Sequence, residues 1–140
     1  MKTVQPWFIP GREVLSIKSQ YQGEYPVDID LKVEKEQDFS VVLVSGRIDA
    51  TTSEELEDTL LSLLDNGEKK IILDLEQTEY ISSAGLRVLV VITKQLYDSG
   101  YFCLCNASEN VLEIIEMAGF HVFMNICDDR KSAITQITEE

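Results

Sequence analysis

Hydrophobic and polar residues alternate strictly from Val27 to Glu34, so that one set of side chains is apolar and the other is charged. A period of two is typical of a strand that buries only one of its faces. A second, more apolar run over residues 39–44 follows after a short polar connection. Because so short a connection cannot cross the face of a sheet, we expect the two strands to be antiparallel, with the first at a sheet edge.

Downstream of these strands, runs with helical spacing alternate with short apolar runs. Leu56, Leu60 and Leu63 recur at helical spacing up to a stop at Gly67. The β-branched run over residues 70–75 is typical of a strand buried on both faces. The same reasoning predicts a helix from Ser83 to about Tyr97, a strand over 101–105, a helix ending at Gly119, a weak strand over 122–126 and a last helix containing Ala133 and Ile137.

This order of elements predicts one α/β domain. Strands that alternate with helices pack as a parallel sheet with right-handed crossovers. The antiparallel pair at the start makes the expected sheet mixed but mostly parallel, with about five strands and about four helices. Residues 1–27 are interrupted by prolines and glycines and predict no long element. We therefore divide the chain into an N-terminal arm over residues 1–27 and a domain over residues 28–140.

The arm contains one strongly apolar segment, Trp7-Phe8-Ile9, which holds the only tryptophan of the chain. Such a segment is too apolar for an inert tail. We expect it to dock on the surface of its own domain, ahead of binding a partner or a second copy.

Two helix starts carry residues that can cap a helix. Thr52 and Glu55 fit a capping box, in which the Thr52 hydroxyl and the Glu55 carboxylate bind free amides of the first turn. Ser82 and Ser83 precede the next helix, and one serine there stabilises a helix by about 1 kcal/mol. From the residues alone, capping is the favoured role of this serine pair.

The chain is strongly acidic, with 25 Asp and Glu against 12 Lys and Arg and a net charge of −13. Residues 1–28 hold three basic and three acidic residues, so the whole excess lies on the domain. Nucleic acid and anionic membranes are therefore poor partners, and a partner with a basic face fits better, although solubility alone explains the acidity equally well. No apolar run reaches the ~18 residues of a membrane span and no signal peptide is evident, so we expect a cytoplasmic protein without direct membrane insertion.

No set of residues predicts an enzyme, a cofactor or a metal site. The only histidine is His121, and one histidine without matched ligands makes a poor metal site. The sequence has no nucleotide-binding glycine motif and no nucleophile elbow. We expect Cys103, Cys105 and Cys127 to be buried, reduced thiols, with the first two on one face of a strand.

Three motifs stand in order along the chain. The first combines residues 73–75, Leu-Asp-Leu, with residues 80–86, Tyr-Ile-Ser-Ser-Ala-Gly-Leu. The second is residues 44–52, Val-Ser-Gly-Arg-Ile-Asp-Ala-Thr-Thr, and the third is residues 115–120, Ile-Glu-Met-Ala-Gly-Phe. Together they resemble the STAS domain, the fold of the bacterial anti-sigma factor antagonists, over about residues 28–135.

The resemblance implies a phosphorylation site and a partner-binding surface. Aligning Gly85-Leu86 with the Gly-Leu of the family places Ser83 on the regulatory phosphoserine, with Ser82 as the second choice. Ala84 stands where the family has Ser or Thr, and Ser82 stands where an Asp often precedes the phosphoserine. The partner-binding residues that the resemblance implies are Asp49, Thr52, Ser82, Ser83, Gly85 and Arg87.

The resemblance also implies partners. The unphosphorylated chain is expected to bind an anti-sigma factor, a serine kinase of the histidine-kinase-like ATPase fold, and so to free a sigma factor. ATP and Mg²⁺ would belong to that kinase, and a phosphatase is expected to reverse the phosphorylation. The implied role is that of a phosphoprotein of bacterial signalling that regulates transcription by partner switching. The oligomeric state stays open, with a homodimer among the options.

Three alternatives remain beside this function. STAS domains also serve as accessory subunits of membrane transporters, where they bind an ATPase subunit without phosphorylation. A receiver domain is the second alternative, because Asp74 follows a buried strand, but the acidic cluster and the lysine that receivers need are not evident. The third is a redox protein using Cys103 and Cys105, which their spacing disfavours.

Overall fold

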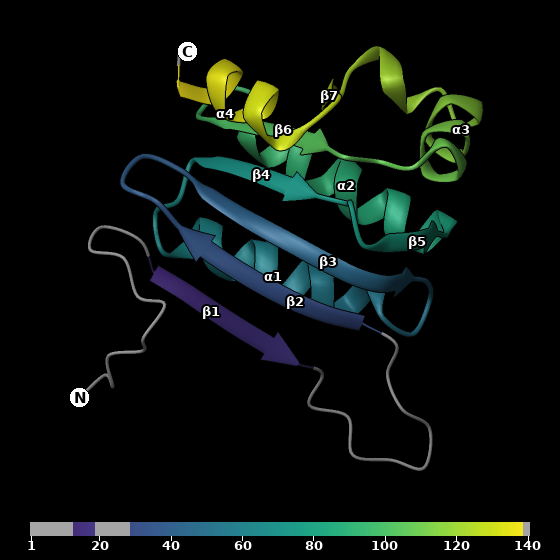
Figure 1. Ribbon diagram of the computed structural model, residues 1–140, viewed down its shortest axis with the longest axis horizontal. Helices are drawn as coiled ribbons and strands as arrows, with labels where there is room; N and C mark the ends of the chain where they lie inside the picture. Colours follow the sequence, from purple (N-terminus) through teal and green to yellow (C-terminus); the bar gives the residue numbers. More distant parts are fainter. Residues whose placement is uncertain (1–12, 19–28, 139–140) are drawn as a thin grey trace.

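A sheet of seven strands runs through the described part of the chain (Figure 1). The computed structural model describes residues 13–18 and 29–138. The strands are β1 (Glu13–Lys18), β2 (Ile29–Lys35), β3 (Ser40–Ile48), β4 (Lys70–Asp74), β5 (Thr78–Ile81), β6 (Tyr101–Cys105) and β7 (Asn125–Cys127). The helices are α1 (Ser53–Asp65), α2 (Ser83–Leu96), α3 (Glu109–Met117) and α4 (Arg130–Thr138), with a 3₁₀ turn η1 (Phe120–Val122) after α3.

The strand order confirms a mixed, mostly parallel sheet. The strands lie in the order β1-β2-β3-β4-β6-β7, and β5 pairs with β3 beyond the end of β4. β2 is antiparallel to both β1 and β3, whereas β3, β4, β6 and β7 run parallel to one another, as does β5 to β3. The antiparallel pair at the start, the α/β class and the four helices agree with the sequence prediction.

Two strands were not expected. β1 lies within the predicted arm and pairs with the outer side of β2, so the prediction that the first domain strand is a sheet edge is wrong. Alternation shows only that one face of β2 is exposed, and it carries no information about the edges of that strand. β5 lies in the segment predicted as a loop before Ser83. Trp7-Phe8-Ile9 and its expected docking fall outside the described residues.

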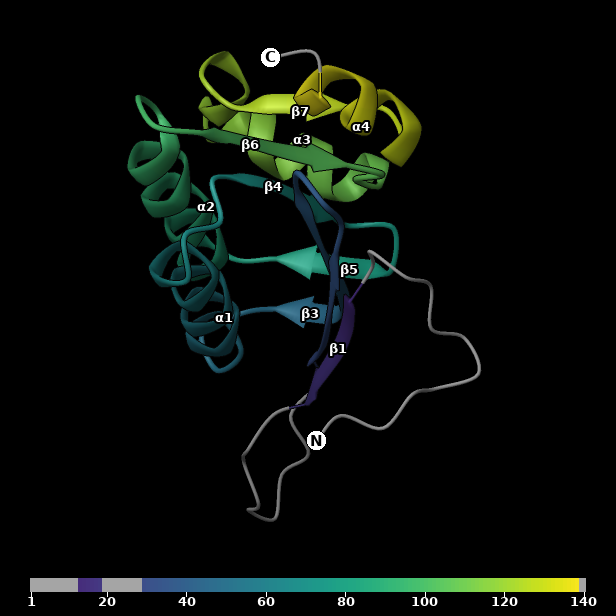
Figure 2. The same ribbon diagram turned by 90° about the vertical axis from the view of Figure 1, so that its left-hand side faces the viewer.

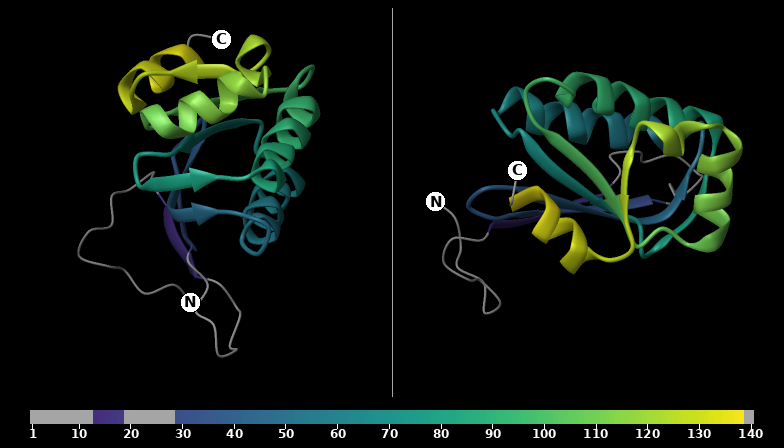
Figure 3. Two further views of the ribbon diagram at one scale, coloured as in Figure 1. Left: turned by 90° about the vertical axis from the view of Figure 1, so that its right-hand side faces the viewer. Right: turned by 90° about the horizontal axis from the view of Figure 1, so that it is seen from above.

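The helices cover the two faces of the sheet unequally. α1 and α2 lie side by side on one face, and α4 lies on the other, as the end-on views in Figures 2 and 3 show. α3 closes the end of the first layer beside β5, where the Asn110 side chain donates a hydrogen bond to the Glu79 carbonyl oxygen at 3.3 Å. The larger apolar cluster lies under α1, α2 and α3 and includes Leu56, Leu60 and Leu89, all fully buried. Burying these aliphatic side chains is the main source of stability of the domain.

A buried ion-pair network holds α4 to its face of the sheet. Arg130, the first residue of α4, places its Nε and Nη2 atoms 3.0 Å from Asp74 Oδ2 and its Nη1 atom 3.2 Å from Glu34 Oε1. Asp74 also accepts hydrogen bonds from the Asn106 side chain and the Glu76 amide. Burial lowers the pKa of Arg130, but the two carboxylates outweigh burial and hold that pKa above its usual value. The network therefore joins β2, β4 and α4.

The same network removes the basis of the receiver-domain alternative. The Asp74 side chain is 3% exposed and is occupied by Arg130. A phospho-acceptor carboxylate must reach an incoming phosphoryl group, which Asp74 cannot do in this arrangement. Asp74 is thus a structural anchor of α4.

We predict that Arg130→Gln destabilises the domain. Removing one partner of a fully buried ion pair costs about 3–5 kcal/mol, and we expect about 2 kcal/mol here because Arg130 keeps partial contact with water. Urea unfolding followed by circular dichroism measures this change. Lys131→Gln removes the same charge from the next, exposed residue and should change the free energy of unfolding by less than about 0.5 kcal/mol. Equal unfolding midpoints for both variants would show that the network is not needed.

Candidate functional site

The loop after β3 and the start of α2 meet at one end of the sheet. β5 runs parallel to β3 with Ile48 opposite Ile81, which brings the residues that follow each strand side by side. The Ser82 amide then donates a hydrogen bond to the Ile48 carbonyl oxygen at 2.8 Å. The Asp49 loop and the serine pair, which the resemblance placed on one surface, are therefore neighbours in space.

The two serines have different roles. Ser82 is the N-cap of α2, with an extended backbone and a side-chain oxygen that accepts a hydrogen bond from the Gly85 amide at 3.3 Å. Ser83 is the first helical residue and is exposed. Its hydroxyl has no hydrogen-bond partner among the residues that the structure describes. The helix is capped by Ser82, so the Ser83 hydroxyl is left available for chemistry.

Gly85 allows α2 to begin directly on the ends of the strands. A Cβ atom at this position would lie 2.5 Å from Cγ2 of Ile48 and 2.8 Å from Cγ1 of Ile81. Both isoleucines are buried and β-branched, so neither can move aside easily. Gly85 itself is buried, and it contributes to the site by the close approach of the helix.

Asp49 organises the loop before α1. Its Oδ1 atom accepts hydrogen bonds from the Thr51 hydroxyl at 2.7 Å, the Thr51 amide at 2.9 Å and the Thr52 amide at 3.2 Å. The hydrogen bond from the Thr51 hydroxyl is the largest of the causes that lower the pKa of Asp49. The carboxylate is therefore ionised at neutral pH and half-buried at the rim of the site.

Thr52 does not form the predicted capping box. Its hydroxyl donates to the Arg47 carbonyl oxygen at 2.6 Å and accepts from the Asp49 amide at 2.9 Å, and it makes no cap hydrogen bond. The backbone of Thr52 is already helical, which turns the hydroxyl back toward the loop. Thr52 is 1% exposed, so it braces the loop from inside.

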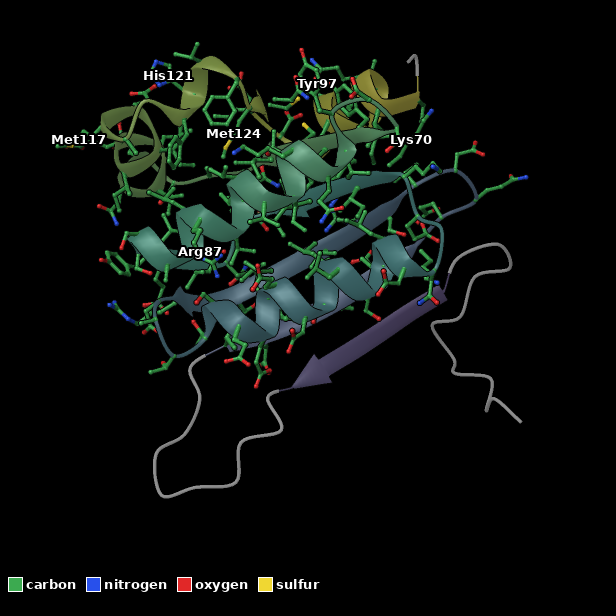
Figure 4. All side chains as sticks on the ribbon, turned by 180° about the vertical axis from the view of Figure 1, so that it is seen from behind. Lys70, Arg87, Tyr97, Met117, His121 and Met124 are labelled. Atoms are coloured by element: carbon green, nitrogen blue, oxygen red, sulfur yellow. The ribbon has the colours of Figure 1, made fainter. Side chains whose placement is uncertain are left out.

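Two arginines border the site. Arg87 lies on α2 (Figure 4) and is 66% exposed. Its Nη2 atom lies 3.6 Å from Oε1 of Glu57 on α1. The Arg47 guanidinium lies 4.6 Å from the centre of the Tyr80 ring, with its Nε atom 4.0 Å from Asp49 Oδ2. Sequence reasoning missed Arg47 and Tyr80. The sequence does contain a hint of their position. Each residue stands one place before the buried isoleucine that ends its strand, so both side chains point to the face opposite that isoleucine.

The six residues that the resemblance implied fall into two groups. Ser83 and Arg87 are exposed, and Asp49 and Ser82 are half-buried, so these four can offer atoms to a partner. Thr52 and Gly85 are buried and shape the surface from below. The structure brings all six to the same end of the sheet through the two loops and the first turns of α1 and α2.

The three cysteines lie under α4, on the face of the sheet opposite α1 and α2. All are buried and free, as predicted, and Sγ of Cys103 lies 3.2 Å from Sγ of Cys127. Burial raises the pKa of Cys105 to about 12, with Asp74 adding to the effect, and burial likewise raises the pKa of Cys103. A thiolate is therefore scarce at neutral pH, which weighs against the redox alternative.

His121 lies exposed in η1. Within residues 29–138 no three His, Cys, Asp or Glu side chains are grouped as ligands of a metal ion. None of the described helices has both the length and the apolar character needed to cross a bilayer.

Comparison with known proteins finds similar proteins both by sequence and by structure. The model of the STAS domain matches residues 30–133. BtrV of Bordetella bronchiseptica, whose name assigns it provisionally to the anti-sigma factor antagonists, is 34% identical over 104 residues, which cover 74% of this chain and 90% of BtrV.

Three solved structures share the fold. An anti-sigma factor antagonist from Mycobacterium paratuberculosis superposes with a TM-score of 0.74 at 24% identity, covering 79% of this chain and 94% of that one. The anti-sigma factor antagonist SpoIIAA in its unphosphorylated form gives a TM-score of 0.68 at 18% identity, covering 79% and 97%. The phosphorylated form of SpoIIAA from Bacillus gives a TM-score of 0.60, covering 76% and 98%.

We predict that the buried thiols are inert in the folded protein. At pH 7.5 in iodoacetamide, alkylation of Cys103 and Cys105 should be at least about a hundredfold slower in the native protein than in urea, because their thiolates are disfavoured by burial. Mass spectrometry of tryptic peptides measures alkylation at each cysteine. Rapid native alkylation of either residue would revive the redox alternative.

Proposed function

Because the chain belongs to the STAS domain family, we propose that it is an anti-sigma factor antagonist that acts by partner switching. With Ser83 unphosphorylated, it binds an anti-sigma factor, a serine kinase of the histidine-kinase-like ATPase fold, and the sigma factor of that kinase is freed. Phosphorylation of Ser83 releases the kinase, which can then hold its sigma factor again. The proposal places the chain in the bacterial cytoplasm, where transcription takes place.

The observation that carries this proposal is the division of roles between the two serines. Ser82 caps α2 through the Gly85 amide, whereas the exposed Ser83 hydroxyl makes no hydrogen bond to the described residues. Modifying Ser82 would cost the cap, worth about 1 kcal/mol, and modifying Ser83 would not. Ser83 is therefore the better acceptor, and Ser82 remains the second choice.

The chemistry of the switch is a phosphoryl transfer in which this chain is the substrate. The kinase transfers the γ-phosphoryl group of ATP to Ser83 Oγ, the hydroxyl proton is released, and ADP leaves. ATP, Mg²⁺ and the catalytic groups belong to the kinase, so the chain itself is not an enzyme. A phosphatase that hydrolyses the phosphoserine returns the chain to its binding state.

Electrostatics supports a switch that alters binding without unfolding. A phosphoserine adds a charge of about −1.5 to −2 and is tolerated at a helix N-terminus. The surface that receives it already has the ionised Asp49 carboxylate at its rim. A partner fitted to a neutral hydroxyl must then desolvate a dianion, which opposes binding.

The relatives support the same role in part. BtrV and SpoIIAA carry the name of anti-sigma factor antagonists, and SpoIIAA has been solved both with and without phosphorylation. Asp49, Ser82, Ser83 and Arg87 are the residues we propose to contact the kinase, with Thr52 and Gly85 shaping the surface beneath them.

We predict that Ser83→Asp strongly reduces capture of the kinase. Native lysate is passed over three baits, namely the unmodified chain, Ser83→Asp and Ser99→Asp, and captured proteins are identified by mass spectrometry. Ser99 is exposed beyond the far end of α2, so its variant adds the same charge away from the site. A histidine-kinase-like ATPase should be recovered by the unmodified chain and Ser99→Asp, and at least about tenfold less by Ser83→Asp.

Thermal unfolding of the three baits is the control for folding. The Ser83→Asp midpoint should stay within about 4 °C of the unmodified chain, because negative charge is favourable at that helix end. Recovery of the same transporter components by all three baits would contradict partner switching and would make the chain a constitutive accessory subunit. Loss of folding in Ser83→Asp would make Ser83 a structural residue.

We further predict that the captured kinase phosphorylates Ser83 and not Ser82. Incubation with ATP and Mg²⁺ should add one phosphate to the unmodified chain and to Ser82→Ala, and none to Ser83→Ala. Intact-mass and fragment-mass spectrometry locate the modification. Phosphate on Ser83→Ala but not on Ser82→Ala would move the switch to Ser82.

A further inference from the structure

Arg87 stands one helical turn after Ser83 on the same face of α2. Ser83 is the first residue of the helix and Arg87 the fifth, so their side chains are neighbours at i and i+4. Side chains on a helix lean toward its N-terminus, which directs the long Arg87 side chain back toward Ser83. An acidic group four residues before a basic group is also the more favourable order of such a pair.

The present partner of Arg87 is a weak one. Its Nη2 atom lies 3.6 Å from Glu57 Oε1 on α1, and the Arg87 side chain is 66% exposed. Glu57 is 21% exposed, so the pair lies at the surface with its arginine in water, and a single long contact of this kind contributes little and is screened by salt. Glu57 is the fifth residue of α1 as Arg87 is of α2, so this bridge joins the two helices at matching positions. It can therefore be exchanged for a stronger partner at small cost.

The other charged groups around Ser83 are already committed. Arg47, on the loop side, is held against the Tyr80 ring and beside Asp49. Asp49 is bound by the hydroxyl and amide of Thr51. Of the cations on β3 and α2, namely Arg47, Arg87 and Lys94, Arg87 is the one with both the position and the freedom to move.

We propose that Arg87 is the intramolecular receptor of the phosphate on Ser83. When Ser83 is phosphorylated, the guanidinium leaves Glu57 and binds the phosphate oxygens, for which its planar, multidentate shape is well matched. This inference rests on the proposed function, because it needs phosphorylation at Ser83. It makes Arg87 a positioning residue of the switch.

The exchange changes the surface at three places at once. The neutral Ser83 hydroxyl becomes a dianion, Arg87 is withdrawn from any partner that it contacts, and the carboxylate of Glu57 is left without its cation. A partner that fits the unphosphorylated surface thus meets altered charge on both α1 and α2. One modification therefore changes the surface charge of two neighbouring helices.

The experiment uses the full chain with phosphoserine installed at position 83 during translation. A ³¹P NMR titration measures the second pKa of the phosphate, which is about 6 for free phosphoserine. A guanidinium bound to the phosphate favours the dianion, so Arg87→Gln should raise this pKa by about 0.5 units. Lys94→Gln removes the same charge from an exposed residue about 16 Å from Ser83 along α2, and it should shift the phosphate pKa by no more than about 0.1 units.

Two more variants separate the guanidinium from general charge. Arg87→Lys should recover part of the lowered pKa, because it keeps the charge but loses the planar fork. Glu57→Gln frees Arg87 and removes a negative charge, so it should lower the phosphate pKa further or leave it unchanged. Equal shifts for Arg87→Gln and Lys94→Gln, or a raised pKa in Glu57→Gln, would overturn the proposal.

This titration needs neither kinase nor partner, so its outcome is independent of the switching experiment. A large rise of the phosphate pKa in Arg87→Gln together with undiminished capture by Ser83→Asp would contradict the proposed function. The receptor role of Arg87 would then stand as a property of the chain alone. Loss of capture by Ser83→Asp with an unchanged phosphate pKa in Arg87→Gln would contradict the receptor role alone.

Discussion

The close contact between the start of α2 and the ends of β3 and β5 is the constraint on which the site depends. The helix approaches Ile48 and Ile81 so closely that position 85 has no space for a side chain, and only glycine fits there. The Ser82 amide also donates a hydrogen bond to the Ile48 carbonyl oxygen. With the helix fixed at its first turn, the direction of every residue that follows is fixed too. The exposure of Ser83 and the position of Arg87 over Glu57 both follow from this one contact.

Around that contact, neighbouring polar residues have separate structural and chemical roles. Ser82 caps the helix, Thr52 braces the loop from within and Asp49 organises the turn through its carboxylate. Each of these groups has its hydrogen bonds inside the chain. What is left over is a hydroxyl and a weakly held guanidinium on a rigid support. Such an arrangement favours signalling by a change of surface charge over signalling by a change of backbone.

The sequence was most informative where a pattern reports a local property. Periodicity predicted the four helices, and the short polar connection before residue 39 predicted the antiparallel pair, because each depends on a short run of residues. It missed β1 and β5, whose existence depends on pairing with distant strands. The capping role of Thr52 failed for a similar reason, since its hydroxyl oxygen accepts from the Asp49 amide of the loop instead of from an amide of the helix. For the site, the resemblance indicated the two loops, whereas the roles of Arg47, Tyr80 and Glu57 required coordinates.

The separation of buried from exposed residues at the site has a consequence for how such proteins diversify. Ser83 and Arg87 make few contacts with the core, so substitutions at exposed positions of this surface cost little stability. Thr52 and Gly85 cannot vary in the same way, because the support would be lost. After duplication of such a gene, one copy can therefore be retuned toward a new partner while the scaffold stays intact. Parallel signalling pathways built on one fold could be insulated from cross-talk by changes at a few surface positions.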